Sequence, residues 1–349
     1  MLDAQLYRLS LGAKPTCPGV PWRDLRFSFL QRVTFRVLST EGKHAKPRRT
    51  IKLISMEIQA TLVVGIATHN RSAILAETIA FLAKQTRQPD KIFVAYAEPA
   101  DVANAPALFP HVTFIQTELG LTRQRNAILA LARDHDILLF IDDDFYLDPQ
   151  YLQITERFFL ENPGVVASTG RVLADDIKGP GLTVEQAKSI VASSDGARRE
   201  QRITPTFLAY GCNMCLRLAT IREHNLRFDE TLPLYGWYED WDFSRQITYF
   251  GTLVHISNAC GVHLSTKVGR CTGVRVGYMQ VANPIYLARK GTFRWALVFR
   301  FIAGPCLKNL VRSLAPEAHV DRLGRFYGNL TAFRHLLTGT LSPQQILDL

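Results

Sequence analysis

The stretch Ile137-Leu138-Leu139-Phe140-Ile141-Asp142-Asp143-Asp144 decides how this chain folds. Its five consecutive large apolar residues, bounded by polar ones, predict a β-strand that is buried on both faces. Three carboxylates follow at the carboxyl end of that strand, which is where open α/β sheets bind their ligands. Three neighbouring anions repel one another unless a cation lies among them, and oxygen ligands suit Mg²⁺ or Mn²⁺. The pattern therefore predicts a divalent cation that holds a phosphate group.

A second interpretation of these carboxylates is an acidic loop that caps the helix that follows. Asp148-Pro149 has the form of an N-cap residue with a proline in the first helical turn. Such a loop would need no cation and would bind no ligand. From the residues of this stretch alone, both interpretations stay open.

Strand and helix patterns alternate on both sides of the stretch. Strand patterns cover residues 61–67, 91–96, 111–116, 136–141, 165–171 and 252–256. Helix patterns cover residues 72–85, 121–133, 149–161, 216–224 and 239–249, and the chain beyond residue 282 is mostly helical in pattern. This alternation predicts the α/β class, with a mostly parallel sheet flanked by helices.

A polar stretch over residues 174–204 is too long for a simple connection. Gly179-Pro180-Gly181 and Ser193-Ser194-Asp195-Gly196 supply residues of the kind found at hinges, so one hypothesis is a mobile lid. The alternative is a surface excursion that contains a short helix over residues 184–191. The pattern favours neither.

The charge of the chain is concentrated at its beginning. With 47% hydrophobic residues among 349, the chain can bury a large core, which excludes a disordered protein. Residues 1–55 hold eleven Lys or Arg against three acids, a net charge of +8 out of a total of +10. The folded body is therefore almost neutral, and we expect no nucleic-acid partner. We predict that residues 1–55 are a basic arm, either poorly ordered or an over-extended start, with function beginning near Met56.

Six cysteines in a chain of this length are too few and too scattered for a disulfide scaffold. Cys212-Asn213-Met214-Cys215 has CxxC spacing, but no second pair follows at the spacing of a zinc site. We predict reduced thiols that serve as structural or substrate-wall residues, and a cytoplasmic location.

The most apolar late stretch is Phe293 to Val311. Arg294, Arg300, Lys308 and Pro305 interrupt it, so it lacks the ~20 apolar residues of a membrane span. It could instead lie on the cytoplasmic face of a membrane with its arginines at headgroup level. The alternative is a buried helix on the flank of the domain.

A second acidic cluster lies in Gly236-Trp237-Tyr238-Glu239-Asp240-Trp241-Asp242-Phe243. Glu239 and Asp240 open a predicted helix, where the helix dipole favours carboxylates. Aromatic neighbours remove water, which raises a carboxyl pKa toward the range of a general base. The alternative is simple capping of a surface helix.

Five motifs, in this order, make the chain resemble a GT-A fold glycosyltransferase of the inverting family 2. The resemblance covers Thr61 to about Arg270. The motifs are an opening strand and loop at Val63–Arg71, an Arg-Asn helix start at Gly120–Asn126, a DxD motif at Asp142–Asp144, an acceptor-side turn at Gly211–Met214, and an ED base motif at Glu239-Asp240.

This resemblance implies a Rossmann-like, mostly parallel central sheet in a catalytic domain over residues 56–270. Residues 56–144 would form its nucleotide-sugar half and residues 145–270 its acceptor half. Residues 271–349 would be a helical C-terminal extension that could touch a membrane surface. The implied reaction transfers one sugar, with inversion, from a nucleotide-sugar donor to a polysaccharide or lipid-linked saccharide acceptor, as in polysaccharide and cell-envelope biosynthesis.

The resemblance also implies roles for particular residues and a divalent cation, Mn²⁺ or Mg²⁺. Asp240 would be the general base, with Glu239 beside it as an orienting catalytic residue. Asp144 and His263 would bind the metal, with His255 as a rival to His263. Asn213 and Trp237 would contact the acceptor. The donor would be bound by Thr68, His69, Asn70, Arg71, Arg125, Asp142 and Asp143.

Two departures from the family pattern concern the donor and the product. The second strand usually ends in paired acids that bind the nucleobase, whereas here Glu98 or Asp101 would have to substitute, so UDP is a default expectation. Thr292-Phe293-Arg294-Trp295 matches the end of the Gln-x-x-Arg-Trp motif of processive synthases, but Gly291 occupies the glutamine position. We therefore expect transfer of a single sugar.

Two other functions remain as alternatives. A sugar-nucleotide nucleotidyltransferase would need a glycine-rich loop after the first strand, and residues 68–72 contain no glycine. A catalytically silent sugar-nucleotide-binding protein would not need the intact Glu239-Asp240 pair. The donor sugar, the acceptor, the linkage, the oligomeric state and the role of the C-terminal helices cannot be predicted from these motifs.

Overall fold

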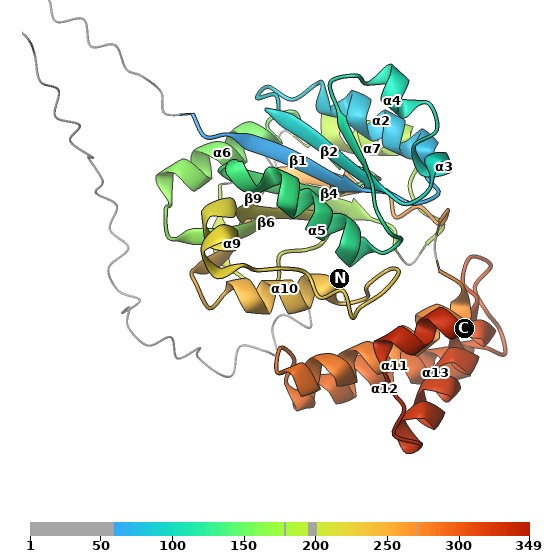
Figure 1. The fold of residues 1–349 in the computed structure, drawn as a ribbon. Coiled ribbons are helices and arrows are strands. Elements are labelled where there is room, and N and C mark those ends of the chain that lie inside the picture. The colour runs from blue at the N-terminus through green and yellow to red at the C-terminus, as the bar shows by residue number, and fades with distance from the viewer. Residues whose placement is uncertain (1–58, 178, 195–200, 270) are drawn as a thin grey trace, which may run out of the picture. The chain divides into compact units, whose positions relative to one another are not determined.

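The computed structural model describes residues 59–177, 179–194, 201–269 and 271–349 (Figure 1). The chain divides into one unit over Met1–Met56 and a second over Glu57–Leu349, and all described residues belong to the second. The predicted basic arm over residues 1–55 therefore lies outside the described residues, as do Arg270 and the hinge residues Asp195-Gly196.

A nine-stranded mixed sheet is the centre of the described part (Figure 1). Its strand order is β3-β2-β1-β4-β8-β6-β9-β5, and β7 pairs with β9 off this path. The strands are β1 Leu62–Ala67, β2 Lys91–Tyr96, β3 Thr113–Gln116, β4 Ile137–Asp142, β5 Phe145–Leu147, β6 Val165–Asp175, β7 Ile203–Pro205, β8 Asn213–Arg217 and β9 Thr252–His263.

The sheet has a parallel half and a mixed half. Strands β3, β2, β1 and β4 are parallel to one another, as predicted from their alternation with helices. Strand β8 is antiparallel to both β4 and β6, whereas β6 and β9 are parallel. The GT-A fold class is confirmed, and the sheet is fully parallel from β3 to β4 and mixed beyond β4.

Apolar residues on both faces of β1 and β4 explain why these strands lie in the middle. Leu62, Val64 and Ile66 belong to one core cluster, while Val63 belongs to a second on the opposite face. The residues of β4 divide in the same way, so the predicted burial of that strand on both faces is confirmed. Gly65 permits close packing, because an added Cβ would lie 2.7 Å from a methyl carbon of Ile128.

Helices cover both faces of the sheet. Residues of α2 and α6 join the first core cluster, and residues of α5, α9 and α10 join the second. The helices up to this point in the chain are α2 Ser72–Leu82, α3 Pro99–Val102, α4 Ala105–Leu108, α5 Leu121–Leu131, α6 Tyr151–Glu161, α7 Val184–Ala192, α9 Leu218–His224 and α10 Glu239–Ile247, with a 3₁₀ turn η1 over Ala132–Asp134.

Several predicted elements differ from the structure, among them β8, β9 and α6. Strand β8 was predicted as the turn before a helix from residue 216, because five residues of mixed pattern give a weak strand signal. Strand β9 continues seven residues beyond the predicted end at Ile256, past polar residues that interrupt its apolar pattern. Helix α6 begins at Tyr151, and Asp148 is buried and accepts from the backbone N–H of Gln150 at 3.0 Å. By these bounds the N-cap residue is Gln150, and Asp148 contacts the backbone just before the helix.

The short helix expected over residues 184–191 is α7, which has the bounds Val184–Ala192. Its buried residues Ala187 and Val191 pack with Val262 and Leu264 in a small cluster of their own. Residues 178 and 195–200 of the same stretch lie outside the described residues. The lid hypothesis therefore stays a prediction.

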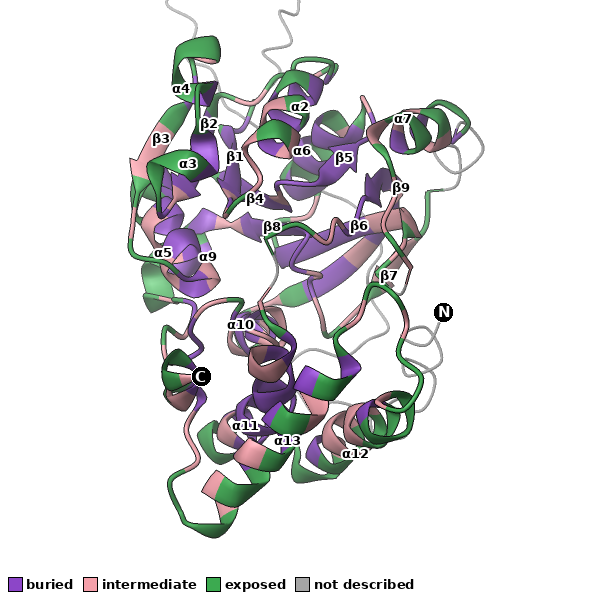
Figure 2. Cartoon of the chain, turned by 90° about the vertical axis from the view of Figure 1, so that its right-hand side faces the viewer, coloured by how far each residue is buried: buried purple, intermediate pink, exposed green. Residues whose placement is uncertain are grey.

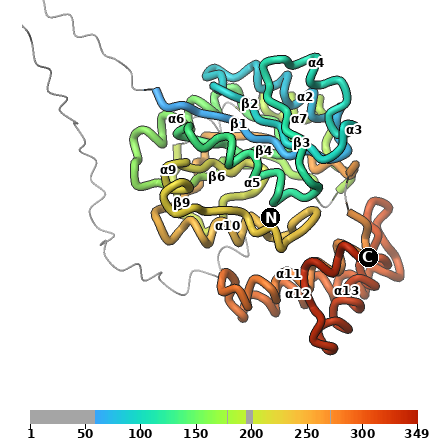
Figure 3. Tube along the Cα trace, viewed as in Figure 1, coloured from blue at the N-terminus to red at the C-terminus, as the bar shows by residue number. Residues whose placement is uncertain are grey.

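The C-terminal region is helical, as predicted (Figure 3). Helix α11 is almost entirely buried and crosses α13 closely. The crossing is so close that a Cβ added to Gly277 or Gly328 would clash with the backbone of the other helix. No helix of the described residues is long and apolar enough to cross a membrane. The elements are α11 Gly273–Lys290, α12 Trp295–Arg312, α13 Arg322–Leu337 and a 3₁₀ turn η2 over Pro343–Asp348.

Candidate active site

The register of the sheet brings the two halves of the predicted metal site together. Strands β1 and β4 are parallel and paired Ala67 to Asp142, so the loop after β1 lies beside the acidic turn. Strand β5 is antiparallel to β9 and pairs Phe145 with His263, which places His263 next to the same turn. Residues far apart in the sequence thus meet at the carboxyl ends of β1 and β4.

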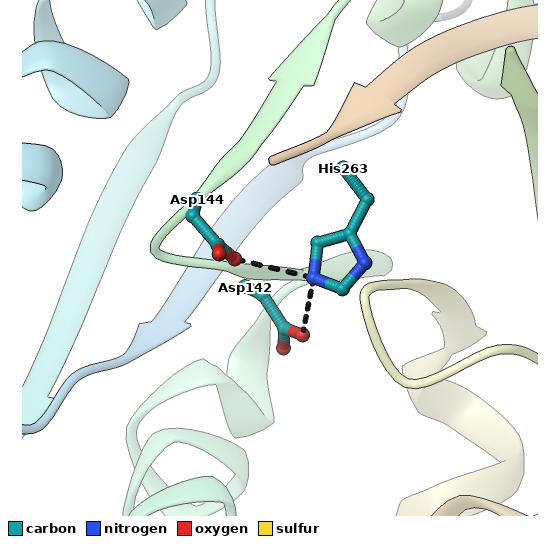
Figure 4. Close-up of side chains that lie close together, drawn as sticks. All are labelled: Asp142, Asp144 and His263. Atoms are coloured by element: carbon teal, nitrogen blue, oxygen red, sulfur yellow. Dashed lines mark ion pairs between the residues drawn. The ribbon is translucent and has the colours of Figure 1, made fainter. Parts of the chain in front are cut away.

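Asp142, Asp144 and His263 point toward one another (Figure 4) and offer three ligand atoms within 4.8 Å of one another. The His263 Nε2 lies 3.3 Å from Asp144 Oδ1 and 3.7 Å from Asp142 Oδ2. Asp144 Oδ1 is buried without a hydrogen-bond partner, while Oδ2 accepts from the N–H of Thr266 at 2.9 Å. Two carboxylates and an imidazole with a spare buried oxygen fit a divalent cation such as Mn²⁺ or Mg²⁺. His255, the rival ligand, is not in this cluster.

Asp175, which the sequence analysis missed, orients His263 from behind. Its Oδ1 lies 3.4 Å from His263 Nδ1, and its Oδ2 accepts from the Tyr210 hydroxyl at 3.1 Å. Burial lowers the pKa of His263, but the carboxylates of Asp144 and Asp175 outweigh it and raise that pKa to about 10. A carboxylate behind a ligating histidine fixes the ring and its tautomer. The predicted strand ended at residue 171, so no local signal placed Asp175 here.

Asp143 turns inward and holds the loop after β1. Its side chain is buried and accepts from Thr68 Oγ1 at 2.7 Å and from Arg71 Nη1 at 2.9 Å. Burial and the neighbouring Asp144 raise the pKa of Asp143 against the opposing effect of Arg71. Arg71 also lies 3.8 Å from Asp144. The contacts of Asp143 are therefore with predicted donor-binding residues.

The remaining donor-loop residues are positioned by Asp101. Asn70 has a positive φ of 56°, and its N–H donates to Asp101 Oδ1 at 2.8 Å. The other oxygen of this fully buried carboxylate accepts from the N–H groups of Ala97 and Glu98 at 3.0 and 2.9 Å. His69 Nδ1 lies 3.2 Å from the same carboxylate. Both oxygens of Asp101 thus contact the loop and its flanking residues, whereas Glu98 is exposed.

The second acidic cluster opens α10. Asp240 is half-buried, and its two oxygens accept from the N–H groups of Gly211 at 3.2 Å and Trp241 at 2.8 Å. Glu239 is buried and pairs with Arg125. Burial raises the pKa of both carboxyl groups, and the Asp240 charge adds to the effect on Glu239. Asp240 is the member of the pair that retains access to solvent.

Arg125 joins the two acidic clusters. Its buried guanidinium pairs with Glu239, lies 3.4 Å from Asp142 Oδ1 and donates to the carbonyl oxygen of Gly211 at 2.8 Å. The rings of Phe140 and Phe228 pack on it, with centroids at 5.5 and 5.4 Å. Arg125 was predicted to bind the donor, and that role stays a prediction; its contacts within the protein connect the two acidic clusters.

The two predicted acceptor residues have different surroundings. Asn213 is fully buried in β8, where its amide bonds to the hydroxyl of Thr169 and the carbonyl of Gly170. Asn213 belongs to β8, which pairs with β4 and β6, and its acceptor contact stays a prediction. Trp237 is half-buried beside the exposed Tyr235, with ring centroids 5.8 Å apart, so its acceptor role stays a prediction.

The C-terminal helices hold α10 in place. The Lys290 ammonium lies 2.7 Å from Asp242 Oδ2, and the Thr292 hydroxyl donates to Asp242 Oδ1 at 2.7 Å. The ring of Trp241 packs on Phe293 and Phe301. The sequence offered no signal for this support, because its partners lie some fifty residues away along the chain.

Comparisons with known proteins agree with this geometry. Residues 63–220 match the model of glycosyl transferase family 2. No curated protein matches the sequence. The solved structure of S. aureus TarS 1–349 in complex with UDP-GlcNAc is similar, with 14% identity, a TM-score of 0.50, and coverage of 79% of this chain and 81% of that one. The structure of GalNAc-T7 with UDP, GalNAc and Mn²⁺ has 13% identity and a TM-score of 0.49, and covers 71% of this chain and 55% of that one.

The family match spans the loop after β1, the acidic turn and β8, and it ends before α10. The similar solved structure of TarS agrees with the α/β architecture. The chain is therefore a GT-A fold glycosyltransferase in which residues 63–220 match glycosyl transferase family 2.

Proposed function

We propose that this glycosyltransferase moves a single sugar, with inversion, from a nucleotide-sugar donor to a polysaccharide or lipid-linked saccharide acceptor, with Asp240 as the general base. One observation carries the proposal. Arg125 and Gly211 connect the acidic turn to the α10 carboxylates: Arg125 contacts Asp142 and Glu239, and the N–H of Gly211 donates to Asp240. A candidate donor site and a candidate base therefore share one set of hydrogen bonds.

On the donor side, Asp142, Asp144 and His263 would hold Mn²⁺ or Mg²⁺. A cation there would stabilise the charge that develops on the departing diphosphate. The loop Thr68-His69-Asn70-Arg71 would bind the nucleotide, because Asp143 and Asp101 hold it at the edge of the same cluster. TarS was solved with UDP-GlcNAc, so we propose a uridine diphosphate sugar as the first donor class to test.

On the acceptor side, Asp240 would accept the proton of an attacking hydroxyl. Attack on the anomeric carbon from the face opposite the diphosphate inverts that carbon. The raised pKa of Asp240 makes it a stronger base than an ordinary carboxylate. Glu239, paired with Arg125, would orient Asp240 or the acceptor, and Trp237 would stack on the acceptor sugar.

We also propose a cytoplasmic location with peripheral contact to the cytoplasmic membrane face. The five cysteines among the described residues are free thiols, which is consistent with a reducing compartment. Glycan acceptors carried on lipids are presented at such a membrane surface.

A panel of nucleotide sugars tests the proposal. We expect release of free nucleotide from one of them, dependent on Mn²⁺ or Mg²⁺ and increased by a saccharide acceptor, and a product of inverted anomeric configuration by NMR. Full turnover in Asp240→Asn, or indifference to EDTA, would contradict the mechanism. Pyrophosphate-dependent exchange would favour a nucleotidyltransferase, and donor binding without release under any condition would favour a silent binding protein.

A further inference from the structure

Helix α12 presents an exposed row of large apolar side chains. The row consists of Trp295, Phe299, Leu307, Leu310 and, just beyond the helix end, Leu314. Successive members are three, four or eight residues apart, which places them on one face of a helix. The opposite face packs inward through the buried Val298 and Asn309. The exposed row is therefore not part of the core of the protein.

Helix α13 repeats this arrangement. Its exposed apolar residues, three or four positions apart, are Leu323, Tyr327, Leu330, Phe333 and Leu337. Its buried face, which includes Gly328, Asn329 and Ala332, packs on α11. Figure 2 shows exposed segments along both helices. We call these two rows together the α12–α13 face. Exposed apolar patches of this extent mark interaction surfaces.

The charged residues of helices α12 and α13 themselves are all basic. Neither helix contains an aspartate or a glutamate, whereas Arg300, Arg312 and Arg334 are exposed on them. Glu317, in the connecting loop, is occupied by Arg322 and lies 3.7 Å from Lys308. Asp321 caps α13 through the N–H of Gly324. The apolar rows are therefore flanked by cations whose charge no acid of either helix neutralises.

This charge pattern favours an anionic binding partner for the α12–α13 face over a basic one. A second copy of the chain, joined by a two-fold axis, would bring the same arginines toward one another. The N-terminal residues 1–55 carry a net charge of +8, so they too would be repelled. An anionic lipid surface offers both an apolar layer and negative headgroups.

We propose that the α12–α13 face binds the surface of an anionic bilayer. The apolar rows lie in the boundary between headgroups and acyl chains, and the arginines contact lipid phosphates. The inference rests on the peripheral membrane contact proposed above and names the surface that makes it, but it needs neither donor nor acceptor. It would hold the enzyme at the surface where a lipid-linked acceptor is anchored.

Vesicle flotation of the full-length protein, without nucleotide or acceptor, tests the inference independently of catalysis. We expect binding to vesicles of equal parts phosphatidylglycerol and phosphatidylcholine, and far less to phosphatidylcholine alone. Phe299→Glu/Leu307→Glu changes side chains that are 78% and 63% exposed, so folding is preserved. It should lower the bound fraction about tenfold, because each buried apolar side chain contributes to interfacial binding.

The matched control is Leu108→Glu/Tyr249→Glu, whose side chains are 57% and 81% exposed on the catalytic domain. It should bind like the wild type. The basic N-terminal residues also attract anionic vesicles, but that attraction is equal in both variants and falls with salt. In about 0.3 M NaCl the attraction of the N-terminal residues is screened. Equal binding of the wild type and Phe299→Glu/Leu307→Glu under that condition would overturn the inference.

Tryptophan quenching by brominated lipids localises the contact. We expect quenching in a Trp22→Phe protein and its loss when Trp295→Phe is added, because Trp295 begins the α12 row. Unchanged quenching would contradict the inference. A dimer observed by sedimentation velocity would also contradict the inference if it did not float with vesicles and if Phe299→Glu/Leu307→Glu dissociated it. The α12–α13 face would then join two copies of the chain.

Discussion

Asp144 of the acidic turn and Asp240 at the start of α10 are the same residue type but have opposite electrostatic surroundings. At the acidic turn, burial opposes ionisation of Asp144, but His263 and Arg71 outweigh it and lower its pKa. At the start of α10, burial and neighbouring carboxylates raise the pKa of Glu239 and Asp240. A lowered pKa suits a permanent anionic ligand, and a raised pKa suits a base. The comparison shows that surroundings, not residue type, separate a ligand from a base.

The largest effect is expected at the base. Asp240→Asn removes the proton acceptor but keeps the shape of the side chain, so kcat should fall by about 10²- to 10⁴-fold. Calorimetric titration should show unchanged donor affinity, because the donor contacts lie at the other cluster. The control is Glu223→Gln, an exposed acid on α9, which should leave kcat unchanged. A similar loss in that control would mean that the effect at Asp240 is not specific.

The raised pKa also has a direction in a pH profile. A general base works ionised, so kcat/KM should rise with pH through a value above the ordinary carboxyl range. A rise that is complete within the range of an unperturbed aspartate would show that the electrostatic difference between the clusters is absent in solution.

Arg125→Gln breaks the connection between the clusters. Removing one partner of a buried ion pair costs about 3–5 kcal/mol, which urea denaturation at neutral pH would measure. Glu239 binds its proton more tightly when folded than when unfolded, so its contribution to stability falls as pH rises from the ordinary carboxyl range through the raised pKa.

Arg125→Gln should therefore recover part of its lost stability as the pH is lowered toward the ordinary carboxyl range. Arg123→Gln is the control, since Arg123 lies on the same helix but pairs with the exposed Glu118. A pH-independent loss in Arg125→Gln would contradict the role of Glu239.

Asp175→Asn tests the predicted metal site without changing the carboxylates at the start of α10. It keeps the volume of the side chain but removes the charge behind His263, so Mn²⁺ affinity should fall by about 10- to 100-fold. Manganese EPR titration without substrate gives this affinity directly. Asp176→Asn, a change in the adjacent residue outside the cation cluster, should leave the affinity unchanged. Equal affinity in Asp175→Asn and the wild type would remove Asp175 from the site.

The smallest effect is expected from the C-terminal helices. Gly277→Ala forces α11 away from the backbone of α13, which should cost about 1–3 kcal/mol. Because these helices hold α10, kcat should fall a few-fold while Mn²⁺ affinity stays the same. Gly304→Ala in α12 has open space around it and is the control, and it should not destabilise the protein. Equal losses of kcat and Mn²⁺ affinity in Gly277→Ala would show that α10 is not the element affected.

Much of the fold was predictable because its first half consists of local patterns. The strand predicted over residues 91–96 has those bounds, and β1 and β4 differ from their predictions by one residue. The second half was less predictable. Strands β8 and β9 were missed or shortened because their residues alternate poorly and their partners lie far away in the sequence.

Particular residues of the site show the same division. His263 was predicted from a motif, and the pairing of Phe145 with His263 brings it to Asp144. Asp175 belongs to no motif and was missed, whereas Asn213 was predicted from a motif and its amide bonds to Thr169 and Gly170. Arg125 was predicted to bind the donor, and its contacts within the protein are with Glu239, Asp142 and Gly211.

The sequence by itself determined that residues 137–141 form a strand buried on both faces and that three carboxylates follow it, because five large apolar residues and their polar boundary are local facts. It also determined the order of the family motifs. Only the tertiary structure decided which of those carboxylates faces His263, which holds the loop after β1, and which group lies between the acidic clusters. Strand register and long-range ion pairs set these contacts, and they join residues that are about thirty to 120 positions apart.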